Sequence, residues 1–205
     1  QQFRVHMNVD GPDADQQAMI AEHFTKRCPI YTTLIQAAPI EITFNDEAMA
    51  GPYAEGLATS TIETTLTNQP GRAFVNVRGN YSVVDSVPPL GGPNEAVNPL
   101  DLLLAAQGTC GTFIAEKAAL DMDIPLDGAS LGIEVDFDPK GVKDGSVSPH
   151  IQAMRVNWEM SGVDDAQADT IVNEWLKRCP IYNTLKRATD ITVMIDGETM
   201  AMADQ

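Results

Sequence analysis

The chain has 205 residues, of which 43% are hydrophobic, and its formal net charge is −16. This length suits one larger domain, or one domain of about 150 residues plus a fragment, and the apolar fraction is enough for a packed core. The acidic balance argues against nucleic acids and anionic membranes as partners, because both attract basic surfaces. The sequence has no run of about 18 apolar residues, so it predicts no membrane span.

The first 50 residues predict a strand, two helices and a second strand. Apolar and polar residues alternate over 3–10, which indicates a strand. Asp13 can cap a helix that runs to Arg27, and Pro29 suits the first position of a short second helix. Alternation returns over 40–44 and indicates a strand.

The middle of the chain predicts strands and the longest helix. Strands are expected at 59–67, 73–77 and 83–84. Asn98 and Pro99 then open a helix over 100–120, as N-cap and first helical residue. Residues 131–137 and 151–160 have a hairpin pattern around a glycine-rich loop. The last stretch predicts a strand, a helix, a short helix and a strand, at 154–160, 165–178, from Pro180, and 191–195.

The first 50 residues repeat the end of the chain. The run KRCPIY occurs at Lys26–Tyr31 and again at Lys177–Tyr182. The match extends without a gap from Phe3/Met154 to Ala50/Ala201. An ungapped match of this kind indicates a structural repeat, although a fragment of about 50 residues cannot bury enough apolar surface alone. We therefore expect residues 1–50 to dock on the rest of the chain or on another chain.

Two of the three cysteines occupy positions that point to thiol chemistry. Cys110 lies on the apolar stripe of the long helix, with Leu103, Ala106 and Ile114. Cys179 stands at the start of a short helix, where free backbone N–H groups lower a thiol pKa. A small buried hydrophobe is the alternative interpretation of Cys110, and a helix cap that of Cys179. Three cysteines fit a reducing cytoplasm, and the three histidines lack the spacing of metal ligands, so we expect no metal site and no cofactor.

The segment Asn98–Cys110, NPLDLLLAAQGTC, resembles the signature helix of the OsmC/Ohr family. Arg178–Leu185, RCPIYNTL, is similar to the second signature of that family, and Pro89–Pro93 resembles the loop before its helix. The resemblance covers about residues 57 to 200. It implies an α+β fold with a mainly antiparallel sheet, a long central helix bearing Cys110 and a second helix ending at Cys179. Residues 51–205 would form the complete OsmC-like domain, and residues 1–50 a partial repeat of its C-terminal strand–helix–strand.

The resemblance implies a thiol peroxidase that reduces organic hydroperoxides. Cys110 would form the sulfenate, and Cys179 would resolve it as a disulfide. A dithiol, such as a lipoylated protein, would recycle the enzyme, and the active unit would be a homodimer or an intrachain pseudo-dimer. The rival hypothesis is an OsmC-like binding or structural protein with weak or no peroxidase activity.

The chain departs from the Ohr branch of the family beside the signature helix. Leu100 stands where that branch has Glu, and Asp101 follows one residue late, which is about 100° around a helix. Asp101 is therefore expected to cap the first turn of the helix. The arginine that supports the thiolate in this branch could be Arg72 or Arg78, and an exposed strand arginine is the alternative for either.

Cys28 matches Cys179 in the repeat, but the equivalent of Cys110 would precede residue 1. Either the natural polypeptide is a tandem of two such domains, or a partial duplication left the fragment without a catalytic partner. In both cases we expect Cys28 to have no redox partner in this chain. We expect residues 1–50 to have a structural role, covering a surface that a second subunit covers in ordinary members.

Overall fold

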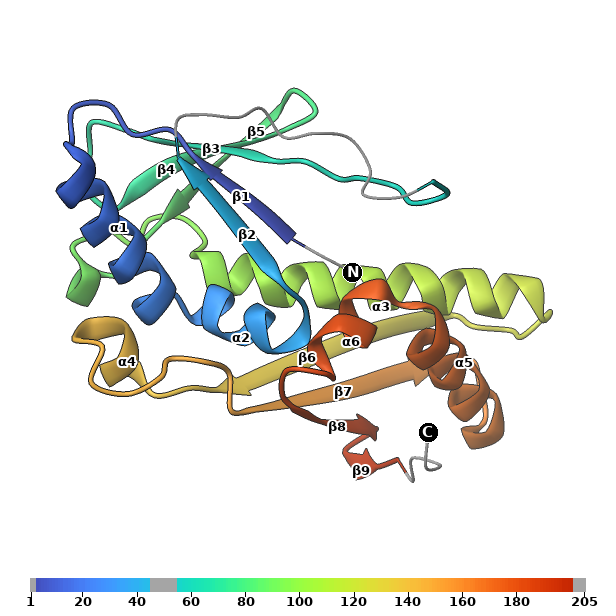
Figure 1. The fold of residues 1–205 in the computed structure, drawn as a ribbon. Coiled ribbons are helices and arrows are strands. Elements are labelled where there is room, and N and C mark those ends of the chain that lie inside the picture. The colour runs from blue at the N-terminus through green and yellow to red at the C-terminus, as the bar shows by residue number, and fades with distance from the viewer. Residues whose placement is uncertain (1–2, 45–54, 201–205) are drawn as a thin grey trace. The chain divides into compact units, whose positions relative to one another are not determined.

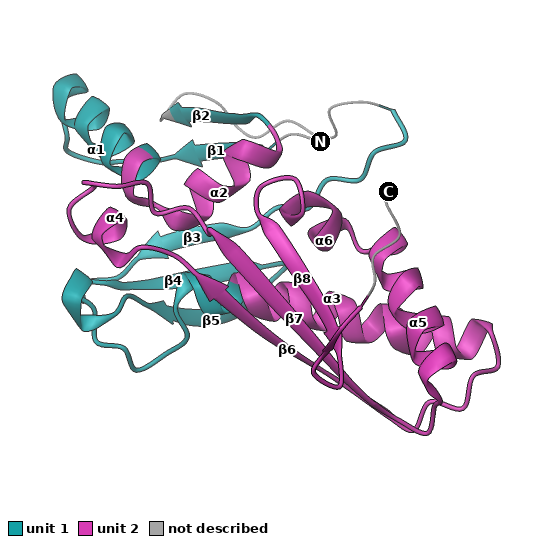
Figure 2. Ribbon diagram, turned by 90° about the horizontal axis from the view of Figure 1, so that it is seen from below, with its two compact units in different colours: residues 1–25, 39–102 teal, residues 26–38, 103–205 magenta. Residues whose placement is uncertain are grey.

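The computed structural model describes residues 3–44 and 55–200. The chain divides into two compact units, shown in Figure 2: unit 1 is residues 1–25 and 39–102, and unit 2 is residues 26–38 and 103–205. The expected boundary at residues 50/51 lies outside the described residues, so that division stays a prediction. In the described part of the chain, no helix combines the length and apolar character of a membrane crossing. Figure 1 labels the helices and strands, which are β1 (Phe3–Met7), α1 (Ala14–Arg27), α2 (Pro29–Ala37), β2 (Ile40–Phe44), β3 (Glu63–Leu66), β4 (Arg72–Val77), β5 (Asn80–Asp85), α3 (Pro99–Asp121), β6 (Gly128–Asp136), α4 (Pro139–Lys143), β7 (Ala153–Ser161), α5 (Asp165–Arg178), α6 (Pro180–Leu185), β8 (Asp190–Ile195) and β9 (Glu198–Thr199). A short 3-10 turn, Pro88–Leu90, precedes α3.

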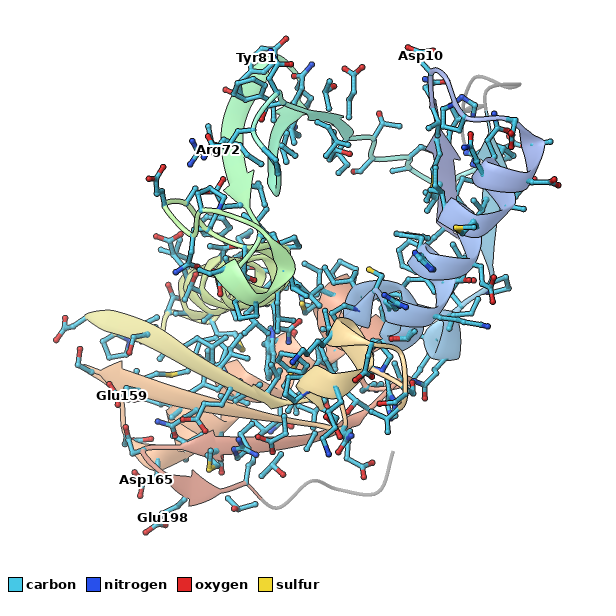
Figure 3. The ribbon with its side chains drawn as sticks, turned by 90° about the vertical axis from the view of Figure 1, so that its left-hand side faces the viewer. Asp10, Arg72, Tyr81, Glu159, Asp165 and Glu198 are labelled. Atoms are coloured by element: carbon cyan, nitrogen blue, oxygen red, sulfur yellow. The ribbon has the colours of Figure 1, made fainter. Side chains whose placement is uncertain are left out.

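Unit 1 contains two small sheets. Strands β1 and β2 pair in parallel, and β3, β4 and β5 form an antiparallel meander. The β4–β5 hairpin turns at Arg78 and Gly79, whose φ angles are 53° and 83°. Two consecutive left-handed residues match the tight hairpin turn that suits the natural strand twist. Figure 3 shows Tyr81 near this turn and Arg72 on the same meander.

Unit 2 is built on one sheet with an apolar and a charged face. The strand order is β6-β7-β8-β9, and only the β7–β8 pair is parallel. Along β7, Met154, Val156 and Trp158 alternate with more exposed residues, as expected for a strand with one buried face. On the charged face, Arg155 pairs with Glu134 and Asp136 of β6. Figure 2 shows α3 behind the sheet, on the apolar face.

The apolar face is covered by α3 and α5 through small and aromatic residues. Ala115, Ala118 and Ala119 of α3 are almost completely buried, which lets the helix approach the strands closely. Trp175 of α5 meets Trp158 of β7 edge to face, with ring centroids 5.4 Å apart. The expected α+β fold with a long helix bearing Cys110 is confirmed.

The sequence analysis did not predict the short helix α4, although Asp138 as its N-cap and Pro139 as its first residue are signals of a helix start.

The sequence repeat is a structural repeat in its details. In the first copy Phe3 of β1 pairs with Ile40 of β2, and in the second Met154 pairs with Ile191, which is the same parallel register. The helix of each copy opens with the same reciprocal cap, Asp13 with Gln16 and Asp164 with Gln167. The two local sequences therefore reproduce the same strand–helix–helix–strand geometry.

Helix α2 belongs to unit 2, although it lies in the first copy of the repeat. It packs against α6, its counterpart in the second copy. Its Thr33 is fully buried, and the Thr33 Oγ1 accepts a hydrogen bond from the Ile151 backbone N–H at 2.8 Å. Leu34 packs against the main apolar core. This segment of the first copy is thus built into the core of unit 2.

Candidate active site

The structure brings two cysteines together inside unit 2. The Cys179 thiol donates a hydrogen bond to the Cys110 sulfur, and the two sulfurs are 2.9 Å apart across a sequence separation of 69 residues. Both cysteines are free thiols. Cys110 is partly exposed, whereas Cys179 is fully buried. The pair that the family resemblance implied is therefore adjacent, with Cys110 as the member closer to solvent.

Cys110 is placed by the middle of α3. The N-terminus of α3 is fixed by a reciprocal cap in which Asn98 Oδ1 accepts from the backbone N–H groups of Leu100 and Asp101. Asp101 Oδ2 accepts from the Asn98 N–H in return. Asp101 thus caps the first turn of α3, as its place in the sequence predicts.

Two glycines flank Cys110, and they differ in what they pack against. A Cβ added at Gly111 would lie 2.6 Å from Leu131 Cδ2 and 3.2 Å from the Trp158 ring, so glycine permits the close approach of α3 to the sheet here. At Gly108 the nearest atom would be Ile133 Cδ1, at an ordinary 3.8 Å. Close packing therefore accounts for the glycine at 111 and not for the glycine at 108.

Cys179 is placed by the junction between α5 and α6. It ends α5 with an extended backbone, and Pro180 opens α6 immediately afterwards. The Cys179 sulfur accepts a hydrogen bond from the Tyr182 backbone N–H at 3.3 Å. The Ile181 N–H, also in the first turn of α6, bonds to the Cys110 sulfur. Backbone N–H groups in the first turn of a helix have no partner within the helix, and here two of them contact the two sulfurs.

The surroundings keep Cys110 protonated in the reduced protein. Burial raises the pKa of the Cys110 thiol, and the neighbouring Cys179 sulfur adds to this, so that the pKa reaches about 12. The hydrogen bond from the Ile181 N–H acts in the opposite direction, because it favours the thiolate. A thiol in this state needs a further favourable charge or donor to become a fast nucleophile.

Aromatic side chains of α5 and α6 belong to the same buried core cluster as Cys179. Trp175 stacks at a tilt on Tyr182, with ring centroids 4.8 Å apart, and both rings are buried.

A hollow of about 380 Å³ lies between α3 and β6 and is lined by Leu104, Ala105, Gly108, Thr109, Thr112, Leu131 and Ile133. At 100° per residue, the α3 positions that line it lie on the side of the helix opposite Cys110. The hollow therefore does not open onto the sulfur pair.

The two candidate arginines belong to unit 1. Arg72 makes a two-point ion pair with the buried carboxylate of Asp85, at 2.7 and 2.8 Å, and a further ion pair with Glu95. This guanidinium lowers the pKa of Asp85 to about 2. Arg78 is exposed at the β4–β5 turn. A role for Arg72, Arg78 or Asp101 in assisting Cys110 stays a prediction.

Cys28 repeats the local geometry of Cys179. Its sulfur accepts from the Tyr31 backbone N–H at 3.4 Å, and Pro29 opens α2. Burial raises the pKa of this thiol as well. Cys28 is a free thiol.

Sequence reasoning missed Gln107, which lies three residues before Cys110 on α3. Its side chain is fully buried, and within the described residues neither Nε2 nor Oε1 has a hydrogen-bond partner. The signal was present, because Gln107 is a polar residue beside the apolar stripe that carries Cys110.

Comparison with known proteins agrees with the fold. Residues 92–194 match the OsmC-like protein family. The matched segment includes both cysteines and spans half of the sequence, and the chain therefore belongs to that family. No curated protein matches the chain at a significant level.

Solved structures show the same fold at low sequence identity. An organic hydroperoxide resistance protein OsmC from Legionella pneumophila has 18% identity and a TM-score of 0.55, over 69% of this chain and 98% of its own. An organic hydroperoxide resistance protein from Elizabethkingia anophelis has 16% identity and a TM-score of 0.55, over 69% and 98%. An OsmC-like protein from Mycoplasma pneumoniae has 16% identity and a TM-score of 0.55, over 67% and 96%.

Proposed function

We propose that this protein reduces organic hydroperoxides, with Cys110 as the attacking thiol and Cys179 as the resolving thiol. The observation that carries the proposal is the 2.9 Å separation of the two sulfurs. A disulfide S–S bond is about 2.05 Å long, so a small approach of the sulfurs closes the bond. The partial exposure of Cys110 and the complete burial of Cys179 support this order of roles, because a peroxide from solvent meets Cys110 first.

The reaction has two chemical steps. The Cys110 thiolate attacks the terminal oxygen of the hydroperoxide, an S–O bond forms as the O–O bond breaks, and the alkoxide takes up a proton and leaves as an alcohol. The Cys179 sulfur then attacks the Cys110 sulfur, and the S–O bond breaks. The oxygen leaves as water with the proton that Cys179 gives up. Two thiols lose two electrons in total, and the hydroperoxide gains them.

Returning the disulfide to two thiols requires an external dithiol. A dithiol carrier such as a lipoylated protein supplies two electrons and two protons by thiol–disulfide exchange. We place this cycle in the cytoplasm, where the disulfide is transient. The active unit in this proposal is a homodimer or an intrachain pseudo-dimer.

We assign the first copy of the repeat a structural role. The packing of α2 against α6 and the buried bond from the Ile151 N–H to Thr33 support this assignment. In this role the copy covers a surface that a second subunit covers in ordinary members of the family, and Cys28 takes no part in the reaction.

A single-turnover experiment tests the proposed activity. The reduced protein is mixed with cumene hydroperoxide, and thiol loss at each cysteine is followed by alkylation and peptide mass spectrometry. We expect rapid loss at Cys110 followed by a Cys110–Cys179 disulfide. Cys110→Ser should abolish the reaction, and Cys179→Ser should stop it at a sulfenic acid. Oxidation of Cys110 no faster than a free thiol at the same pH would overturn the proposal.

The second candidate function is a non-catalytic OsmC-like binding or structural protein. Two observations favour it: the pKa of Cys110 is raised to about 12, and Leu100 stands in place of the family's glutamate. Both features work against a reactive thiolate. The same experiment separates the candidates, because this alternative predicts thiol loss at Cys110 at the rate of an ordinary buried thiol.

A further inference from the structure

Gln107 is the residue nearest Cys110 along α3 among those with buried polar atoms that lack a partner within the described residues. It is 0% exposed, and neither atom of its amide has a hydrogen-bond partner among the described residues. Buried amides in folded proteins nearly always have partners, because losing water without a replacement costs free energy. A position needed only for packing would be better filled by an apolar side chain. The Gln107 amide therefore indicates a hydrogen-bond partner that is absent from the reduced protein and present in another state of the site.

Helix geometry makes Gln107 and Cys110 neighbours on α3. Residues three apart on a helix are neighbours, with Cβ atoms about 5–6 Å apart. Helical side chains lean toward the N-terminus, so the side chain of Cys110 leans toward the turn that carries Gln107. The Gln107 side chain starts in the same direction, so its amide must fold back along the helix to meet the Cys110 sulfur. The two methylenes of Gln107 give its amide the reach to approach the Cys110 sulfur. In the reduced protein the Gln107 amide makes no hydrogen bond to the sulfur of Cys110 or of Cys179. Its Nε2 donor is therefore available to an atom added to Cys110.

We propose that Gln107 donates a hydrogen bond, through Nε2, to the oxygen that Cys110 carries as a sulfenic acid. This inference rests on the proposed function, because that oxygen comes from the hydroperoxide when the O–O bond breaks. A donor at this position stabilises the sulfenic acid and fixes the direction of its S–O bond. The sulfur then stays open to attack by Cys179, with the oxygen held as the leaving atom.

The experiment measures the lifetime of the sulfenic acid in the full chain. A Cys179→Ser background prevents the disulfide, and an excess of hydrogen peroxide, removed after reaction, oxidises Cys110 whether or not the protein is an enzyme. The fraction of the Cys110 peptide labelled by dimedone is followed over time. Gln107→Met keeps the length of the side chain and removes its amide. We expect it to shorten the half-life at least fivefold without lowering the melting temperature.

Two further variants control the result. Thr189→Val removes another buried polar atom without a partner among the described residues, and it should leave the half-life unchanged. Gln107→Asn keeps the amide but is one methylene shorter, so it should shorten the half-life even if Gln107→Met does not fold. An unchanged half-life in a folded Gln107 variant, or an equal loss in Thr189→Val, would overturn the role of Gln107. Slow oxidation of the wild type by cumene hydroperoxide would instead overturn the peroxidase, and the half-lives would still decide the role of Gln107.

Discussion

Cys28 and Cys179 make the same helix cap, and within the described residues a sulfur neighbour is found for Cys179 and not for Cys28. Each caps a helix that begins with proline, and each sulfur accepts from the backbone N–H three residues later, at 3.4 Å for Cys28 and 3.3 Å for Cys179. Cys179 also contacts Cys110 at 2.9 Å. The repeat therefore copied the cap, and the redox pairing depends on α3.

This difference predicts the disulfide that oxidation produces. Mild oxidation should give a Cys110–Cys179 peptide pair, with Cys28 recovered as a free thiol after alkylation. Peptide mapping by mass spectrometry under non-reducing conditions makes the measurement. Cys28→Ser is the control and should leave the pair unchanged. A Cys28–Cys179 pair would contradict the assignment.

The raised pKa of Cys110 predicts the direction of its pH dependence. Burial and the adjacent sulfur raise this pKa to about 12, above the ordinary thiol value of about 8.5. The reactive thiolate is then a minor species at neutral pH, and its fraction grows about tenfold for each pH unit below the pKa. The rate of iodoacetamide alkylation at Cys110 should therefore keep rising beyond pH 9. A plateau near pH 7 would show that a charge or donor lowers the pKa.

Gly111 and Gly108 provide a matched pair of packing variants. Gly111→Ala places a methyl group against the end of the Leu131 side chain, which can rotate away, and 3.2 Å from the buried Trp158 ring, which has less freedom to move. We therefore expect overpacking of about 1 kcal/mol or more at this position, which offsets the gain in helix propensity. Gly108→Ala meets only an ordinary contact and should raise stability by up to about 1 kcal/mol. Urea unfolding of both variants measures the difference. Equal stabilities would show that α3 can shift away from the sheet without loss.

Thr33 tests whether α2 is part of the core of unit 2. Thr33→Val preserves shape but leaves the buried Ile151 N–H without its acceptor, which should cost about 1–3 kcal/mol. Thr32→Val is the control, because the Thr32 hydroxyl donates to carbonyls of its own helical segment, at Cys28 and Pro29. Chemical denaturation compares the two variants. A loss at Thr33 no larger than that at Thr32 would contradict the docking of α2.

Asp85 should make the stability of unit 1 depend on acid pH. Its pKa is held at about 2 by Arg72, below the ordinary value of about 3.9. A carboxylate with a lowered pKa contributes stability above the unfolded value, and that contribution is lost as pH falls from about 4 to 2. Asp85→Asn should lower the melting temperature at pH 7 and flatten the change between pH 4 and 2. A pH profile parallel to that of the wild type would contradict the pairing.

The sequence by itself determined the local elements of this protein. The cap residues Asp13 and Asn98, the prolines at 99 and 180, and the period of apolar residues predicted these helices to within about two residues. They could do so because backbone neighbours and side-chain caps act over a few positions. The expected strand at 59–67 proved longer than the observed β3, Glu63–Leu66, because alternation does not show where pairing with β4 ends. The repeat also predicted the identical geometry around Cys28 and Cys179.

Tertiary structure alone decided which residues meet. Nothing in the spacing of Cys110 and Cys179 fixes a 2.9 Å contact across 69 residues, and only the resemblance to a family implied it. The buried bond from the Ile151 N–H to Thr33 was likewise invisible in the sequence. For Gln107 the sequence shows a polar residue beside an apolar stripe, but its complete burial without a partner among the described residues came only from the structure. Contacts of this kind depend on how helices pack on the sheet, because burial and shape, summed over the whole core, select them.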